Sequence, residues 1–307
     1  MNLSVIIVNW NTRDLLLDCL NSVFSLIEMD FEVWLVDNAS TDGSVDAVEN
    51  NYPSVNIIRN EKNLGFAAAN NKALQRMNGR YALFLNTDTV LTGNAIGMLY
   101  DFLENHPEAA MACGQLLNRD GSPQNSVANF PTPLSLVCGD SFLKLLFPSR
   151  FPSKRKRYSH PIEVDSCIGA CMMVRKEAID SAGMLDERYF FFFEETDWAY
   201  RLKRSGWKIF FVPSAKIYHL QGQSVGHNIE SRILYYKYRY AYFKKWYPSF
   251  YPIIFIIICA RLSLDLILNS LGIVCTLGLH KRIRKKTFVY ARLVYWHIRG
   301  CPCNPRA

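Results

Sequence analysis

Glycine is absent from residues 4–14, the stretch SVIIVNWNTRD close to the amino terminus. A nucleotidyltransferase built on a nucleotide-binding sheet carries a glycine-rich phosphate loop there, with Arg and Lys, because glycine lets backbone amides approach a phosphate closely. Its absence argues against that class. Zinc-binding cysteine pairs are missing too. The nine cysteines are scattered, so reduced thiols in a cytoplasmic compartment are the default expectation.

Acidic residues are almost absent from the last quarter of the chain. Residues 231–307 contain 14 Lys and Arg and a single acid, Asp265, whereas residues 1–230 contain 21 basic and 26 acidic residues. The basic part is also apolar. A basic and apolar segment favours anionic lipid as its partner, whereas charge alone would favour nucleic acid equally. We therefore expect membrane lipid, and no nucleic acid, as a partner of this region.

A long apolar stretch lies within this basic region, at residues 252–279, and Arg261, Asp265 and Gly272 interrupt it. It is long enough to span a bilayer, but it could also lie in the interface or belong to a soluble core. The first residues of the chain form an expected strand rather than a secretory signal. Two domains are predicted: residues 1–228, and a helical, membrane-associating region at 229–307.

Short β-branched runs alternate with helical periodicity over the first 90 residues. Strands are predicted at 3–8, 31–36, 55–59 and 81–85, and helices at 14–26, 44–50 and 65–77. This order favours an α/β fold, an open and mostly parallel sheet with helices on both faces. Six prolines make residues 123–161 a predicted loop or insertion, after which regular structure resumes at 165–182 and 194–212.

Polar side chains follow each of the four predicted strands. They are Asn9 and Asn11, then Asp37 and Asn38, then Asn60 and Asn63, and finally Asn86 and Asp88. Ligands of open α/β sheets bind beyond the carboxyl ends of the strands. Each of these residues alone could be an ordinary turn residue. Four strands that all end in this way predict a binding site.

The residue types suit the transfer of a sugar from a nucleotide diphosphate. Asp37 can accept hydrogen bonds from a base or a ribose, although a helix-capping turn would use it equally well. Asp88 can help to hold a divalent cation that neutralises the diphosphate. His219 can ligate the same cation, or be a surface or core histidine.

Three acids, Glu194, Glu195 and Asp197, follow five consecutive aromatic residues at 189–193. Apolar surroundings raise the pKa of a carboxyl group toward neutrality, which suits a general base. Acids also occur in the first turn of a helix, where they complement the helix dipole. Both interpretations stay open for this cluster.

Taken together, these segments resemble the family 2 glycosyltransferases, specifically a rhamnosyltransferase-like branch. The matching segments stand in the family's order and cover roughly residues 3–225: SVIIVNWN, VDNASTDGS, NEKNLGFAAANN, LFLNTD, CIGACMMVRKEA, GMLDERYFFFFEETDWAYRLKRSGW and YHLQGQS.

This resemblance implies a GT-A fold, an inverting mechanism and a Mg²⁺ or Mn²⁺ cofactor. Asp88 and His219 would bind the metal, and Glu195, or Glu194 beside it, would be the base. The implied nucleotide-sugar residues are Asn9, Asp37, Asn38, Asn63, Gly65 and Asn86, and the implied acceptor-side residues are Gly169, Ala170 and Trp198. Asn86 replaces the first acid of the family's metal motif, and Glu195 stands where aspartate is usual.

The predicted function is transfer of a sugar, with rhamnose from dTDP-rhamnose as the leading donor, onto a glycan or lipid-linked acceptor of cell-surface polysaccharide synthesis. The predicted location is the cytoplasmic face of the cell membrane. A basic cluster at 150–157 would face lipid phosphates there. The alternative is a catalytically silent scaffold that binds sugar nucleotides, which the glutamate at position 195 favours.

Overall fold

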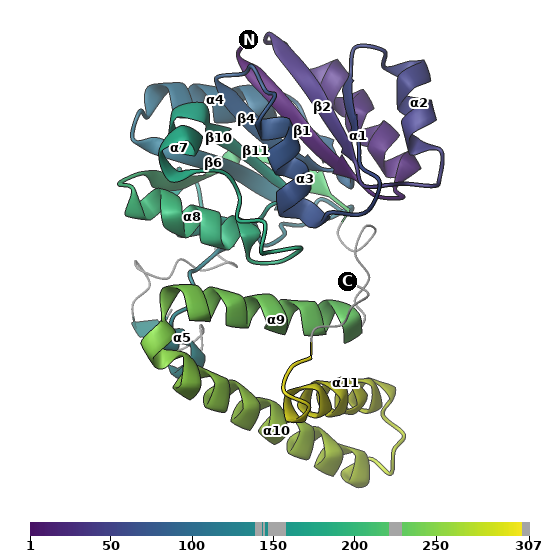
Figure 1. Ribbon diagram of the computed structural model, residues 1–307, viewed down its shortest axis with the longest axis vertical. Helices are drawn as coiled ribbons and strands as arrows, with labels where there is room; N and C mark the ends of the chain where they lie inside the picture. Colours follow the sequence, from purple (N-terminus) through teal and green to yellow (C-terminus); the bar gives the residue numbers. More distant parts are fainter. Residues whose placement is uncertain (139–142, 144, 147–157, 221–228, 303–307) are drawn as a thin grey trace. The chain divides into compact units, whose positions relative to one another are not determined.

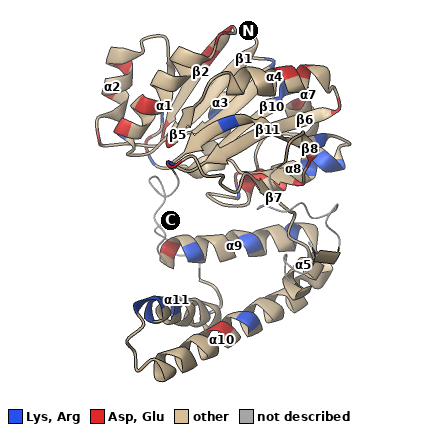
Figure 2. Ribbon diagram, turned by 180° about the vertical axis from the view of Figure 1, so that it is seen from behind, with Lys and Arg blue, Asp and Glu red and all other residues tan. Residues whose placement is uncertain are grey.

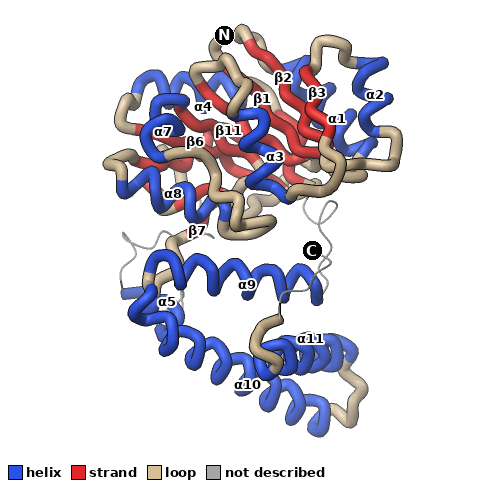
Figure 3. The backbone as a smooth tube through the Cα atoms, in the orientation of Figure 1, coloured by secondary structure: helices blue, strands red, loops and turns tan. Residues whose placement is uncertain are grey.

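The structure is a computed structural model that describes residues 1–138, 143, 145–146, 158–220 and 229–302. The chain divides into two compact units, Met1–Phe130 with Pro148–Ser224, and Pro131–Phe147 with Val225–Ala307. Figure 3 shows the first as a sheet covered by helices and the second as helices. The basic cluster at 150–157 and the segment 221–228 lie outside the described residues.

One large sheet forms the centre of the first unit (Figure 1). Its strand order is β3 (Asn56–Arg59), β2 (Phe31–Asp37), β1 (Leu3–Asn9), β4 (Tyr81–Asn86), β10 (Cys171–Arg175), β6 (Ala109–Leu117), β11 (Lys208–His219) and β5 (Thr89–Leu91). A short strand, β8 (Ile162–Glu163), pairs with β11, and β7 (Val127–Ala128) pairs separately with β9 (Ser166–Cys167).

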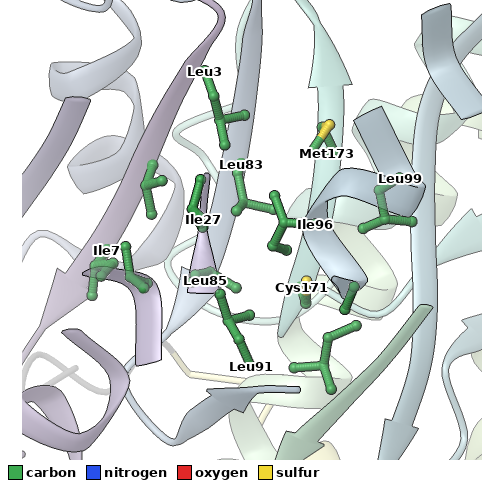
Figure 4. Packing of buried hydrophobic residues seen from close by; sticks show 14 of the residues in the cluster. Leu3, Ile7, Ile27, Leu83, Leu85, Leu91, Ile96, Leu99, Cys171 and Met173 are labelled. Carbon is green, nitrogen blue, oxygen red and sulfur yellow. The ribbon is translucent and has the colours of Figure 1, made fainter. Parts of the chain in front are cut away.

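The alternation of apolar side chains along the strands explains the two layers of helices. Leu3, Val5 and Ile7 of β1 pack on one face, whereas Ile6 packs on the other. Helices α1 (Arg13–Leu26) and α4 (Ala95–Asn105) cover the first face, whose packing Figure 4 shows. The second face is covered by α3 (Gly65–Leu74), α7 (Lys176–Ala182) and α8 (Glu194–Arg204). Helix α2 (Ser44–Asn51) packs beside α1.

The predicted α/β sheet is confirmed, and β1, β2, β3 and β4 are parallel. Two features were not visible in the sequence. Strand β10 is inserted antiparallel between β4 and β6. Strand β11 is longer than the predicted 207–212, because it continues to His219 through a register shift between Val212 and Lys216. Pro213, which cannot donate to a ladder, lies in this shift.

The second unit is helical. It contains α5 (Pro133–Cys138), α9 (Ile229–Trp246), a short 3₁₀ turn (Pro248–Phe250), α10 (Tyr251–Cys275) and α11 (Lys281–Ile298). Among the described residues, one helical stretch, Pro248–Cys275, is long and apolar enough to cross a membrane, with a mean hydropathy of 2.1. Length and composition alone do not distinguish a spanning helix from an interfacial one.

Candidate active site

The carboxyl ends of β1 and β2 form one polar corner of the site. Asn9 and Asp37 are paired across these strands, and Asn9 Nδ2 donates to Asp37 Oδ1 at 2.9 Å and to Ser40 Oγ at 3.0 Å. The second carboxylate oxygen of Asp37 accepts from the Ser40 amide at 2.9 Å. Thr12 Oγ1 donates to Asn9 Oδ1 at 2.8 Å. Both carboxylate oxygens of the buried Asp37 therefore accept hydrogen bonds, and the residue lies at the end of β2, where the sequence predicts it.

A second network of amides joins β2, β3 and α3. Asn60 Nδ2 donates to Asn38 Oδ1 at 2.9 Å, and Asn38 Nδ2 donates to the Gly65 carbonyl at 3.2 Å. Lys72 Nζ donates to Asn60 Oδ1 at 2.6 Å. Asn63 Oδ1 accepts from the Gly65 amide at 2.9 Å. The predicted residues Asn38, Asn63 and Gly65 thus belong to one hydrogen-bonded turn that leads into α3.

Gly65 lies where α3 meets the loop before α8. Its φ is +80°, and a Cβ at this position would lie 2.3 Å from the carbonyl oxygen of Phe190. The next amide, that of Phe66, donates to the same carbonyl at 2.8 Å. Only glycine combines this conformation with so close an approach. Gly65 therefore fixes the aromatic loop at 189–193 against the start of α3.

Asp88 and His219 meet at the end of β11. His219 pairs with Thr89 of β5, which places its Nε2 at 3.4 Å from Asp88 Oδ1. Both side chains are buried, with exposed fractions of 1% for Asp88 and 7% for His219. The structure thus brings together the two predicted metal ligands, although 130 residues separate them in the sequence.

Gln124 defines the tautomer of His219. Its Nε2 donates to the main-chain carbonyl of His219 at 2.5 Å, so its Oε1 must face the imidazole, where it lies 3.0 Å from Nδ1. An amide oxygen only accepts, so Nδ1 carries the proton. In its neutral form, with Nδ1 protonated, the imidazole presents the lone pair of Nε2 toward the carboxylate of Asp88. Two acceptors that face each other at this distance suit a cation between them.

The side chains of Asp88 and His219 suit a divalent cation that is bound together with a diphosphate. Within the described ranges, no group of three or more His, Cys, Asp and Glu side chains is placed to hold a metal. Mg²⁺ in nucleotide sites is commonly held by one or two protein ligands, with substrate phosphates and water completing the shell. A pair consisting of one carboxylate and one imidazole meets that requirement.

Glu194 and Glu195 begin α8 in different surroundings. Glu194 is buried, and its Oε2 accepts no hydrogen bond from the described residues. Burial, together with the charge of Glu195, holds the pKa of Glu194 well above its usual value. Glu195 is half-buried, and burial raises its pKa to about 7 against the opposing effect of the first amides of the helix. Glu195 is therefore the residue of this pair whose pKa lies close to neutral pH.

The turn before α8 is strained. Phe192 and Phe193 both have φ of +72°, a left-handed conformation that costs a bulky residue roughly 1–3 kcal/mol. Asp197 supports the helix from within, because Arg201 Nε donates to its Oδ2 at 3.1 Å and Tyr189 Oη to its Oδ1 at 3.4 Å. Asp197 is fully buried in these contacts, which makes it a supporting residue of α8.

Gly169 and Ala170 connect the two acidic parts of the site. The Asn86 amide donates to the Ala170 carbonyl at 3.0 Å, at the point where β4 leads into Asp88. A Cβ added at Gly169 would lie 4.0 Å from Glu195 Cγ and 3.7 Å from the Phe66 ring. The segment before β10 therefore runs from the end of β4, which precedes Asp88, to the half-buried Glu195.

Trp198 is placed in the core. Its side chain is fully buried, its Nε1 donates to the Gly183 carbonyl at 2.7 Å, and its ring packs edge-on against Phe84 at 5.5 Å. Helix α8 turns this residue toward the sheet, where it belongs to the core of the second face. In this structure the indole supports α8 and presents no surface to an acceptor.

The sequence interpretation missed several residues that contribute to the site. Gln124 lies in the proline-containing stretch predicted as a loop, and its role depends on a contact with β11 that no local pattern reveals. The hydroxyl oxygens of Thr12 and Thr87 are also hydrogen-bonded, 2.8 Å apart, which joins the corner formed by Asn9 and Asp37 to the segment before Asp88. Trp10 directly follows Asn9 and is 52% exposed. The sequence shows this tryptophan directly after an apolar run, and the structure adds that it is exposed.

Residues 4–183 match the model of a protein family described as Glycosyl transferase family 2. The chain is 29% identical over 248 residues to an N-acetylglucosaminyl-diphospho-decaprenol L-rhamnosyltransferase of Mycobacterium tuberculosis, covering 75% of this chain and 80% of that protein. It is 27% identical over 207 residues to a low-salt glycan biosynthesis hexosyltransferase of Haloferax volcanii, covering 66% of this chain and 62% of that protein.

Solved structures share the fold. A mannosyltransferase of Pyrobaculum calidifontis, in complex with GDP-Man and Mn²⁺, aligns with a TM-score of 0.59 at 17% identity, over 97% of this chain and 86% of that chain. A GalNAc-T7 structure with UDP, GalNAc and Mn²⁺ aligns with a TM-score of 0.56 at 17% identity, over 81% of this chain and 51% of that chain. Both likenesses identify the GT-A fold.

Proposed function

The chain belongs to glycosyl transferase family 2 and is a glycosyltransferase; we propose that it transfers a sugar, with inversion and with a divalent cation, from a nucleotide diphosphate to a lipid-linked glycan. Our leading donor is dTDP-rhamnose. The similarity to a rhamnosyltransferase whose name gives a decaprenol-linked substrate supports both the donor and the acceptor class.

The observation that carries the proposal is the continuous path from Asn86 through Ala170 and Gly169 to Glu195. A transferase needs a diphosphate-neutralising group and a base on the same ligand-binding edge. Here the segment that leads to Asp88 and the titrating glutamate are joined by the two residues that directly precede β10, the strand that pairs with β4. The catalytic assignment of both residues is our proposal.

In the proposed reaction the acceptor hydroxyl oxygen attacks the anomeric carbon, the bond from that carbon to the diphosphate oxygen breaks, and Glu195 takes the hydroxyl proton. A carboxyl group with a pKa of about 7 suits this task at neutral pH. Asp37, Asn9, Asn38, Asn63, Gly65 and Asn86 would hold the nucleotide and sugar, and Gly169 and Ala170 would lie beside the acceptor. Trp198 would act indirectly, by positioning α8.

Asp88 and His219 are the residues that would hold Mg²⁺ or Mn²⁺. When bound, the cation would neutralise the negative charge of the departing diphosphate. Gln124 keeps the Nε2 lone pair of His219 available by holding the proton on Nδ1. The buried position of Asp88 keeps its carboxylate out of bulk solvent, where it would be screened.

The donor test is a thermal-shift panel of dTDP, UDP, GDP and CDP, each with and without Mn²⁺. A ligand that binds only the folded state raises Tm by mass action. We expect the largest rise with dTDP and only when the metal is present. A larger metal-dependent rise with UDP would replace the donor in the proposal. No rise with any nucleotide would contradict both the proposed transfer and the scaffold alternative, because both require a bound nucleotide.

Gln124→Leu should weaken Mn²⁺ binding about tenfold, because loss of the outer partner of a ligating histidine typically costs 10–100-fold in affinity. The measurement is isothermal titration of Mn²⁺ in saturating dTDP. Gln115→Leu is the control, because Gln115 bonds to the Gln124 carbonyl and Ser126 of the same segment but not to His219. Equal losses in the two variants would assign the effect to the loop instead of the imidazole.

The proposed location is the cytoplasmic face of the cell membrane. The apolar stretch Pro248–Cys275 and the basic start of α11 support membrane association. A lipid-linked acceptor would also require the enzyme to work at a membrane surface. Residues 1–228 would form the catalytic domain and residues 229–307 the membrane-associating region, to which Pro131–Phe147 would be added because these residues cluster with it.

A further inference from the structure

Helices α10 and α11 form an antiparallel hairpin in the second unit. A Cβ at Gly272, near the end of α10, would lie 3.4 Å from Ile283, near the start of α11. At the other end of the hairpin, the rings of Phe255 and His297 lie 5.9 Å apart. Residues 276–280 connect the two helices. Helix α11 therefore returns along most of α10, from Gly272 to Phe255, and along that length the two helices would reach a similar depth in a membrane.

Helix α10 leaves one full stripe of apolar side chains uncovered. Its buried residues, Ile254, Ile258 and Leu262, are spaced four apart and face the neighbouring helices. The uncovered residues follow the helical spacing of three and four within each half of the helix, with a gap of eight residues in the middle, and they are Ile253, Ile256, Leu264, Ile267, Leu271 and Val274. Each of these side chains is more than half exposed.

Helix α11 is too rich in charged residues to lie in the hydrocarbon core of a bilayer. Five of its first six residues, Lys281–Lys286, are Lys or Arg, as Figure 2 shows in blue, and Arg292 lies in its second half. Between this cluster and Ile298 only 12 residues remain, which span about 18 Å as a helix against a hydrocarbon core of about 30 Å. Exposed Phe288, Tyr295 and Ile298 give the same helix an apolar stripe. Cationic and aromatic residues on one helix are typical of an interfacial helix.

The middle of α10 also carries features that exclude it from the centre of a bilayer. Arg261 is exposed, and its Nη1 donates to the Leu136 carbonyl of α5 at 3.1 Å. Helix α5 has six residues, and only two residues separate it from Phe130 of the α/β unit. A spanning α10 would carry this short helix into hydrocarbon, where the terminal backbone groups that a helix leaves without intrahelical partners are not tolerated.

We propose that α10 and α11 form an in-plane hairpin that binds the surface of an anionic bilayer without crossing it. The inference rests on the proposed membrane association and gives it a geometry. Lipid is favoured over a second copy of the chain by charge. Residues 231–307 carry 14 basic residues and one acid, so two such surfaces repel each other, whereas anionic headgroups attract each of them.

The first experiment is flotation of the full chain with vesicles of phosphatidylcholine, or of phosphatidylcholine with 30% phosphatidylglycerol, at low and high salt. We expect binding to the anionic vesicles that is at least tenfold tighter and weakened by salt. The double variant Lys285→Glu and Lys286→Glu should lose most of the additional affinity for anionic vesicles. The matched control, Lys176→Glu with Lys208→Glu, changes exposed lysines of the α/β unit and should bind as the wild type does.

The second experiment separates an in-plane hairpin from a spanning one. Cys275, exposed at the end of α10, is kept as the reactive cysteine by changing Cys138, Cys259, Cys301 and Cys303 to serine, because the other cysteines are buried. Inverted membrane vesicles of an expressing bacterium are treated with a membrane-impermeant maleimide. An in-plane hairpin leaves Cys275 on the same side of the membrane as the α/β unit. The variant Ser54→Cys, at an exposed position of that unit, serves as the positive control for labelling on this side.

Each outcome has one meaning. Labelling of Cys275 before detergent is added supports the in-plane hairpin. Labelling only after detergent, while Ser54→Cys reacts at once, overturns it and leaves the proposed membrane association intact. A chain that neither floats with vesicles nor remains with cell membranes contradicts the membrane association itself. Self-association through α10 in that case would identify a second copy as the occupant of the stripe.

Discussion

Glu195→Gln should lower kcat by about 10²–10⁴-fold, the range that a positioned general base contributes, while dTDP binding persists. The variant keeps the size of the side chain but cannot take a proton from the acceptor. In the wild type the base acts when it is ionised. Because burial raises its pKa to about 7, kcat/KM should fall as pH drops below about 7. The residual rate of the variant should lose this acidic limb.

Glu194→Gln is the matched comparison for this prediction. Glu194 is buried and its pKa is held well above the usual range, so its surroundings favour the protonated carboxyl group, which glutamine resembles. We expect a loss of less than about tenfold and an acidic limb that is retained. A collapse of turnover in Glu194→Gln, with a mild effect at Glu195, would exchange the roles of the two residues.

Asp88→Asn should abolish the metal-dependent part of dTDP binding and lower kcat/KM by roughly 10²–10³-fold. Asparagine retains the shape of the side chain but removes its charge, and stabilisation of a diphosphate by a cation is worth several kcal/mol. Titration calorimetry with Mn²⁺ and dTDP measures the binding, and steady-state turnover measures the rate. Circular dichroism would establish that the variant is folded.

Asp120→Asn is the control for this substitution. It makes the same change of charge in the loop that precedes Gln124, where the Asp120 carboxylate is exposed and accepts only from Ser122 among the hydrogen bonds seen here. Its expected effect on turnover is less than twofold, since an exposed carboxylate is well screened. If Asp88→Asn bound dTDP and Mn²⁺ as the wild type does, Asp88 would not be a metal ligand.

The relation between the sequence and the site differs from residue to residue. Asn9 and Asp37 could be placed together in advance, because parallel strands bring their carboxyl ends to one edge and both residues follow apolar runs. Asp88 and His219 were predicted as ligands, but their approach to 3.4 Å depends on the extension of β11 through Pro213 to pair with β5. Local pattern ends such a strand at the proline.

Hydrophobic periodicity and charge composition are local properties, and they determined the alternating strands and helices, the polar strand ends and the division between an acidic body and a basic, apolar tail. Tertiary structure alone decided which glutamate titrates near neutrality, because a pKa depends on burial by residues distant in the sequence. It also decided the burial of Trp198, the contact of Gln124 with His219, and the return of α11 along α10, since each of these is set by packing between elements and not by the spacing of residues within one.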